Sequence, residues 1–187
     1  MKRLLIVGAG GHGRCCLDIA REHNTYHEIS FLDDNAVGQC INSALVIGHV
    51  ESLSEYTAEY QDVFVAIGNN ALRKALILEA EALGYKIVSL ISLRAVVSDY
   101  ARIGQGSVIF PGTVVEANAN LGEGCIVAAN ATINHDAIIH ECSLINSNTV
   151  IRPNTDIGEL SSIGSRCVIT FGKKVEAGSI VSDGQVV

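Results

Sequence analysis

The stretch that decides the fold is residues 103–138, which read IGQGSV IFPGTV VEANAN LGEGCI VAANAT INHDAI in blocks of six. Every block begins with an aliphatic residue, and the pattern continues on both sides. Leu, Ile or Val occupies every sixth position from Val97 to Val187, sixteen times in succession. Neither the 3.6-residue period of a helix nor the two-residue period of a strand produces this spacing. The sequence therefore predicts a repeating architecture over this half of the chain.

A second column of small residues follows four positions after these aliphatic residues. It runs from Ala101 to Ser179, and thirteen of its fourteen members are Ala, Ser, Thr or Cys, the exception being Lys173. We interpret eighteen residues as one coil of about three short strands, in which the aliphatic side chain fills the interior and the small residue fits the bend. Stacked coils cover one another's core, so the pattern predicts a parallel β-helix over residues 91–187.

The composition agrees with a narrow core and excludes several classes of protein. Of the 187 residues, 48% are hydrophobic, yet only 5% are aromatic and Trp is absent. That content excludes a disordered polar chain, and no apolar run approaches the roughly 18 residues of a membrane span. The net charge is −7 and Lys and Arg form no cluster, which argues against nucleic acid as a partner.

The N-terminus and the cysteines indicate the compartment. The apolar run at residues 4–7 is too short for the hydrophobic region of a signal peptide, so we interpret it as a strand and expect a cytoplasmic protein. The six cysteines form no C-x-x-C pair and have no His at zinc-site spacing. We therefore expect reduced structural thiols and no metal site.

The first 90 residues alternate between strand and helix patterns, which is typical of a parallel sheet. We predict strands at residues 4–7, 28–32, 45–47, 63–67 and 86–90, and helices at residues 14–22, 50–60 and 71–83. The predicted fold is thus an α/β Rossmann-like unit over residues 1–90, followed by the β-helix of residues 91–187.

A glycine-rich loop follows the first predicted strand. Gly8, Gly10 and Gly13 fit the pattern G-x-G-x-x-G, and Gly11 and His12 lie inside it. Backbone amides at such a helix start bind phosphate. Some 90 residues supply only one mononucleotide half, whereas a dinucleotide fold needs two, so we favour one nucleotide over NAD. The alternative is a tight turn that only packs the helix on the strand.

Other candidate ligands end neighbouring strands. Asp33 and Asp34 follow the second strand, where they are suited to accept hydrogen bonds from hydroxyls or from base N–H groups. Gly68 and Asn69 follow the next long strand. Because ligands bind at the carboxyl ends of parallel strands, we predict that these residues bind the same nucleotide as the glycine loop.

Four motifs together resemble the bacterial sugar acetyltransferase family. They are GAGGHGR (8–14), FLDD (31–34), AIGNNALRK (66–74) and Asn134-His135-Asp136. The family includes UDP-4-amino-sugar N-acetyltransferases and sialic acid O-acetyltransferases. The resemblance implies that the β-helix is left-handed, that the protein is a homotrimer, and that acetyl-CoA lies along the coils between two subunits. It also implies that the N-terminal unit holds a nucleotide sugar.

The resemblance also implies the catalytic pair. His135 matches the general base of the family, and Asp136 matches the carboxylate that orients it. An amine must lose a proton as it attacks a thioester, and a neutral His accepts a proton near pH 7. Without the resemblance, a solvated His at a coil turn remains an equal alternative.

Basic residues after His135 are the candidates for binding the phosphates of coenzyme A. There are four of them, Arg152, Arg166, Lys173 and Lys174. The alternative is that they are ordinary charged residues that keep the surface of the β-helix hydrated.

Two positions depart from the family pattern. Leu144 stands where members often carry a second His, and Pro153 stands where a Gly N–H often binds the thioester oxygen; proline has no N–H. Three hypotheses therefore stay open: an acetyl-CoA-dependent N-acetyltransferase acting on a UDP-4-amino sugar, an O-acetyltransferase of sialic acid or another sugar, and a catalytically weakened nucleotide-sugar-binding homologue.

Overall fold

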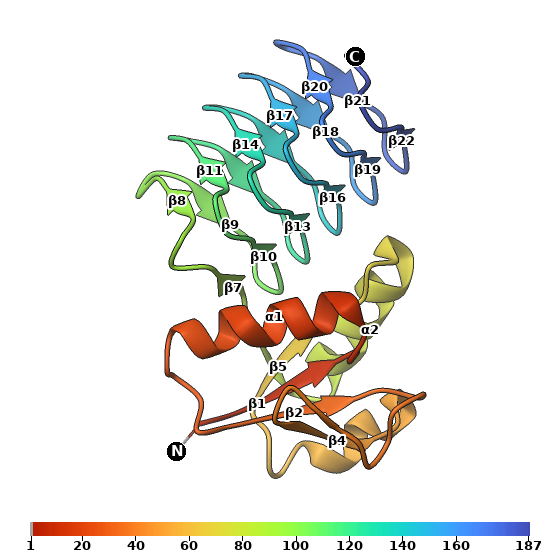
Figure 1. The fold of residues 1–187 in the computed structure, drawn as a ribbon. Helices are drawn as coiled ribbons and strands as arrows, with labels where there is room; N and C mark the ends of the chain where they lie inside the picture. Colours follow the sequence, from red (N-terminus) through yellow and green to blue (C-terminus); the bar gives the residue numbers. More distant parts are fainter. Residues whose placement is uncertain (1) are drawn as a thin grey trace. The chain divides into compact units, whose positions relative to one another are not determined.

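The protein is described here by a computed structural model that covers residues 2–187. Contacts divide the chain into two compact units, one ending at Leu90 and the other formed by Ile91–Val187. Each unit has its own architecture (Figure 1).

The first unit is built around a six-stranded sheet with the strand order β3-β4-β2-β1-β5-β6. The strands are parallel except for β3, which pairs antiparallel with β4. All four residues from Leu4 to Val7 are fully buried, which is why this short aliphatic run forms the centre of the sheet. The elements are β1 (Arg3–Val7), α1 (Gly11–Glu22), β2 (Glu28–Leu32), β3 (Cys40–Ile41), β4 (Ala44–Gly48), the 3-10 helix η1 (Val50–Tyr56), β5 (Asp62–Val65), α2 (Asn70–Ala82) and β6 (Lys86–Ile87).

Several predicted boundaries were wrong. Helix α1 begins at Gly11, three residues before the predicted start, because the glycine loop itself supplies its first turn. The segment predicted as a helix at residues 50–60 is a 3-10 helix that ends at Tyr56. The predicted strand at 86–90 is two strands: β6 stays in this sheet, whereas β7 (Leu90–Ile91) joins a sheet of coil strands. Strand β3 was not predicted.

The second unit consists of three parallel sheets of two-residue strands, as the six-residue period predicts. Partners lie eighteen residues apart, as in Val108↔Ile126 and Val115↔Ile133. The first sheet contains β7, β10 (Val108–Ile109), β13 (Ile126–Val127), β16 (Leu144–Ile145), β19 (Ser162–Ile163) and β22 (Ile180–Val181). The second contains β8 (Val96–Val97), β11 (Val114–Val115), β14 (Thr132–Ile133), β17 (Val150–Ile151) and β20 (Val168–Ile169). The third contains β9 (Arg102–Ile103), β12 (Asn120–Leu121), β15 (Ile138–Ile139), β18 (Asp156–Ile157) and β21 (Lys174–Val175).

The predicted aliphatic column forms the core of this prism. The second residue of each central strand is buried, as Ile133 and Ile151 are, and the column forms one continuous cluster. The small residues lie buried at the corners. Their hydroxyls are satisfied across coils: Ser143 Oγ donates to the carbonyl of Gly158 at 3.0 Å, and Thr149 Oγ1 to that of Gly164 at 2.6 Å. The prism therefore buries polar corner groups with their hydrogen bonds made.

From Gly106 to Gly184, each turn between strands contains one residue in the left-handed conformation, three positions after the aliphatic residue of the six-residue repeat. Asn118, Asp136 and Asn154 occupy this position in successive coils with φ near 60°. Asn and Asp tolerate this conformation better than most residues, which explains their eighteen-residue spacing. Within residues 2–187, no helix is long and apolar enough to cross a membrane.

Candidate functional site

The glycine loop lies at the edge of the first unit where the parallel strands end. Val7, Leu32 and Val65 are the final residues of β1, β2 and β5 and lie in register. The segments that follow these strands contain all the nucleotide-binding residues predicted above. The structure therefore brings the residues of the three segments to one edge of the sheet.

The glycines of this loop fall into two groups. A side chain at Gly8 would meet the carbonyl oxygen of Ala66 at 2.9 Å, and one at Gly13 would collide with the carbonyl oxygen of Gly8. These two are required for packing. At Gly10 and Gly68, by contrast, nothing lies within 4 Å of an added Cβ. The N-cap of α1, Gly10, makes no side-chain hydrogen bond to the first turn, and a helix start of this kind suits an anion.

The two carboxylates after β2 have different roles. Asp33 Oδ2 accepts a hydrogen bond from the Ala9 amide and Oδ1 accepts one from the Asn35 amide, both at 2.9 Å. Asp33 therefore holds the glycine loop in place. Asp34 Oδ1 accepts from the Val50 amide at 2.9 Å, and its side chain is 63% exposed.

The loop after β5 is held by Arg73, which sequence reasoning did not single out as functional. Its side chain is fully buried and donates to the carbonyls of Ile67 at 2.8 Å and Gly68 at 3.2 Å. Asn69, predicted to bind ligand, caps α2 by accepting from the Leu72 amide at 2.9 Å. One sequence signal pointed to Arg73: it stands three and four residues before Leu76 and Ile77, on the buried face of α2.

His12 is an uncharged group within the loop. Burial, and then the charge of Arg73, lower the pKa of His12 to about 4. Its Nε2 lies 3.7 Å from the Sγ of Cys16. His12 is therefore neutral at pH 7 and does not add positive charge to the phosphate loop.

In the second unit, His135 and Asp136 lie on a turn between the second and third sheets. We call the turns that link these two sheets the His135 corner; it comprises residues 98–101, 116–119, 134–137, 152–155 and 170–173. His135 Nδ1 lies 2.7 Å from Asp136 Oδ2, and the His135 amide donates to Glu116 Oε2 at 2.8 Å. The hydrogen bonds from His135 and Asn118 lower the pKa of Asp136. The carboxylate thus engages Nδ1, and Nε2 is left as the nitrogen that can accept a proton.

The four basic residues do not form one patch. Arg152 and Lys173 lie on the His135 corner, in the next two coils. Lys174 lies on the flat third sheet, paired with Asp156. Arg166 lies on the turn from β19 to β20, between the first and second sheets. Each six-residue step moves the chain to the next face of the prism, so these four residues lie on different faces.

A second His–Asp pair involves His140, on the turn that leads from the third sheet to the first. His140 Nε2 is 3.0 Å from Asp156 Oδ1, beside an open pocket of about 540 Å³ that Lys174 and Glu141 also line. The His140 side chain is 44% exposed. Among residues 2–187, no group of three or more His, Cys, Asp or Glu could hold a metal ion.

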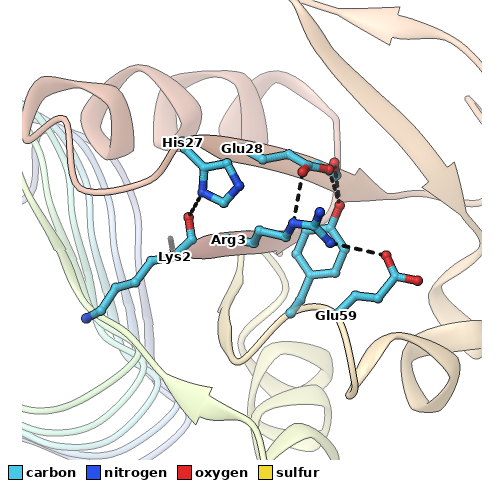
Figure 2. Close-up of polar contacts among 7 residues, drawn as sticks. Lys2, Arg3, His27, Glu28 and Glu59 are labelled. Atoms are coloured by element: carbon cyan, nitrogen blue, oxygen red, sulfur yellow. Dashed lines mark hydrogen bonds and ion pairs between the residues drawn. The ribbon is translucent and has the colours of Figure 1, made fainter.

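A polar cluster also lies at the opposite edge of the first unit's sheet, where the strands begin (Figure 2). Arg3 Nε lies 2.9 Å from Glu28 Oε2, and Arg3 Nη1 lies 3.4 Å from Glu59 Oε2. His27 Nδ1 lies 2.7 Å from the carbonyl of Lys2. These contacts fix the strand starts and are separate from the glycine-loop edge.

Comparisons with known proteins now place the chain in a family. Residues 3–80 match the PglD N-terminal domain family, and residues 100–135 match the bacterial transferase hexapeptide (six repeats) family. The acetyltransferase domain of PglB from Neisseria gonorrhoeae is 37% identical, with a TM-score of 0.96 over 100% of this chain and 91% of that chain. The chain belongs to the bacterial sugar acetyltransferase family.

Two further family members are informative. The UDP-N-acetylbacillosamine N-acetyltransferase of Bacillus subtilis is 33% identical over 114 residues, which are 58% of this chain and 51% of that protein. The match thus spans about half the length of this curated relative. The structure of PerB from Caulobacter crescentus with CoA and GDP-perosamine is 26% identical, with a TM-score of 0.92 over 100% of this chain and 89% of that one.

The second unit of this sugar acetyltransferase family member is a left-handed parallel β-helix, as expected. Pro153 and Phe171 stand one and two coils beyond His135 on the same corner, and Phe171 is 66% exposed. Leu144 is on β16 in the first sheet, away from that corner. Pro153 is therefore the departure that adjoins the candidate base.

Proposed function

We propose that this protein transfers the acetyl group of acetyl-CoA to the amine of a nucleotide-linked amino sugar of the UDP-4-amino-sugar class. The observation that carries the proposal is the 2.7 Å contact of His135 Nδ1 with Asp136 in a chain that also has an open glycine loop. Its support comes from relatives: the Bacillus subtilis protein is named as a UDP-N-acetylbacillosamine N-acetyltransferase, and the PglB domain has been solved with acetyl coenzyme A.

His135 acts as the general base in this proposal. The sugar amine attacks the thioester carbonyl, the new C–N bond forms, and the amine proton passes to His135 Nε2. The C–S bond then breaks, and the coenzyme A thiolate leaves and takes up the proton. Asp136 holds the Nδ1 proton, fixes the tautomer and stabilises the imidazolium that forms.

The nucleotide sugar is bound by the first unit in this proposal. The start of α1 at Gly10 and Gly11 suits its diphosphate, and Gly68 leaves space at the same edge. Gly8, Gly13 and Asn69 act by shaping the edge. The carboxylates of Asp33 and Asp34 lie at the same edge and complete the proposed nucleotide-binding site.

Acetyl-CoA is held on the second unit. Because Arg152 and Lys173 share the corner of His135, we assign the phosphate contacts to these two rather than to Arg166 or Lys174. Pro153 supplies no N–H for the thioester oxygen. Losing one such donor typically costs about 100-fold in rate, so this position favours the second candidate function, a weakened homologue that binds a nucleotide sugar.

We further propose that the protein is a homotrimer and works in the cytoplasm. The outward positions of the second sheet are Val96, Val114, Thr132, Val150 and Val168, and this mostly apolar row suits burial against another copy. All six cysteines are free thiols, as in a reducing compartment.

The decisive experiment incubates the protein with acetyl-CoA and a panel of UDP-4-amino sugars, GDP-amino sugars and sialic acid, and detects acetylated product by mass spectrometry. We expect transfer to a nucleotide-linked amine and a loss of about 100-fold or more in kcat for His135→Ala. His27→Ala, at the opposite edge of the other unit, is the matched control and should keep full activity. Nucleotide-sugar binding without transfer would support the weakened homologue; transfer only to sialic acid would support the O-acetyltransferase.

A further inference from the structure

Helix α2 carries an apolar stripe on its exposed side. Its core-facing side is formed by the four buried residues Arg73, Leu76, Ile77 and Ala80. By the helical period of 3.6, the opposite side is formed by four exposed apolar residues, Ala71, Ala75, Leu78 and Ala82. We call these four the α2 stripe. The solvent side of a surface helix normally carries charged and polar residues, so the α2 stripe indicates a contact surface.

The spacing of the α2 stripe is that of a helix–helix contact. Its members are four, three and four residues apart, as are the contact positions of a coiled coil. Leu78 is 56% exposed, and the other three members are alanines, whose small side chains let a facing helix approach closely. The stripe therefore suits a second helix with the same spacing.

The charges beside the α2 stripe make it complementary to itself. Lys74 and Glu81 lie on the same flank of the stripe, seven residues apart. When two copies of α2 pair antiparallel, the same flanks meet, and Lys74 of each copy faces Glu81 of the other. Leu78 then faces Ala75, a large residue against a small one, as close packing requires. In a parallel pair Leu78 would face Leu78 and Ala75 would face Ala75, which leaves the contact unevenly filled.

We propose that α2 docks against α2 of a second copy of this chain in an antiparallel pair. Such a contact is isologous, so each residue pair occurs twice, and the contact contains two Lys74–Glu81 pairs. It lies in the first unit, whereas the apolar row assigned above to the trimer lies in the second. Pairing through α2 therefore doubles the number of chains in the assembly, and it does not depend on the proposed acetyl transfer.

The test is the mass of the full chain in solution, measured by analytical ultracentrifugation over a range of concentrations. The wild type should double its mass as its concentration rises. Ala75→Arg places a long charged side chain where the pair has room only for a small one, so the doubling should disappear. Ala58→Arg is the matched control, because it makes the same exchange at an exposed residue of the same unit, and it should keep the doubling. Circular dichroism establishes that each variant is folded.

Exchange of the two charges tests the orientation of the pair. Lys74→Glu sets acidic side chains against each other in both symmetric contacts, so the dissociation constant of the pair should rise at least about fivefold. Adding Glu81→Lys restores opposite charges in the antiparallel arrangement and should return the constant to its wild-type value. A double variant as weak as the single one would overturn the antiparallel pairing.

Two further results would overturn the proposal. One is a wild-type mass that stays constant over the whole concentration range. The other is a threefold rather than a twofold loss of mass in Ala75→Arg, because it would assign the α2 stripe to the trimer. Neither result bears on acetyl transfer, which the product assay measures separately.

Discussion

Single residues in the first unit divide into those that shape the glycine loop and those left open to a ligand. Gly8, Gly13 and Asp33 belong to the first group, and Gly10 and Asp34 to the second. The motif spacing predicted that these residues lie together. The motif spacing did not predict which residues shape the loop and which stay open to a ligand. That difference depends on which backbone amides donate hydrogen bonds to each carboxylate. The contact between His135 and Asp136 joins sequence neighbours, and the resemblance had already singled it out.

His12 makes the stability of the fold sensitive to acid. Its pKa is lowered to about 4 in the folded protein and is near 6.5 when unfolded. Between these values the unfolded chain binds more protons, so stability falls as pH drops from about 6.5 towards 4. At pH 5 the free energy of unfolding of the His12→Asn variant should therefore have decreased by about 1–2 kcal/mol less than that of the wild type, relative to neutral pH. Urea unfolding of both proteins at pH 7 and pH 5 measures it; the same pH dependence in both would contradict the assignment.

Among the elements, the short strands and turns of the prism were predicted well. Every coil places an aliphatic residue in the core and a small residue at the corner, so the same pattern recurs along the sequence. Elements that depend on one particular contact were not. The 3-10 helix η1 is an example: Tyr56, its last residue, donates through its hydroxyl to the carbonyl of Ile47. The partition of residues 86–91 between two sheets is another, since residues 87–91 form one mostly apolar run with no break between the two strands.

The corners of the prism separate residues that a linear reading of the sequence groups together. Arg152 is on the His135 corner and Arg166 is on another. Removing a basic side chain that contacts the phosphates of acetyl-CoA weakens binding of acetyl-CoA, whereas removing a basic side chain elsewhere does not. Arg152→Ala should therefore raise the KM for acetyl-CoA about tenfold with little change in kcat. Arg166→Ala is the matched comparison and should leave KM unchanged; equal effects would show that the corner does not define the donor site.

On the scale of the whole molecule, the chain comprises two units with separate cores. The first buries Leu4 to Val7 within a sheet, and the second buries its aliphatic column within a prism. The sequence predicted this change of architecture from the change of period alone. The sequence did not show which candidate residue contacts which ligand, because ligand-binding residues do not recur at a fixed spacing.

Separate cores lead us to expect separate unfolding steps. A ligand stabilises the state that binds it by about 2.7 kcal/mol at 100 times its Kd. In calorimetry, UDP should therefore raise the melting temperature of one transition, and acetyl-CoA that of the other. A single transition raised by both ligands would contradict this expectation and show that the two units unfold as one.

The eighteen-residue register of the coils also constrains how such a chain can change length during evolution. Losing or gaining one residue within the prism would bring a turn residue into the aliphatic column and displace every later strand. A change of six residues would restore the column but move all later corner residues to another face, so Arg152 and Lys173 would leave the corner of His135. Only whole coils can be duplicated or deleted with both the core and the corners intact. The prism can thus lengthen only in steps of a whole coil, whereas the surface loops of the first unit can accept insertions of any size.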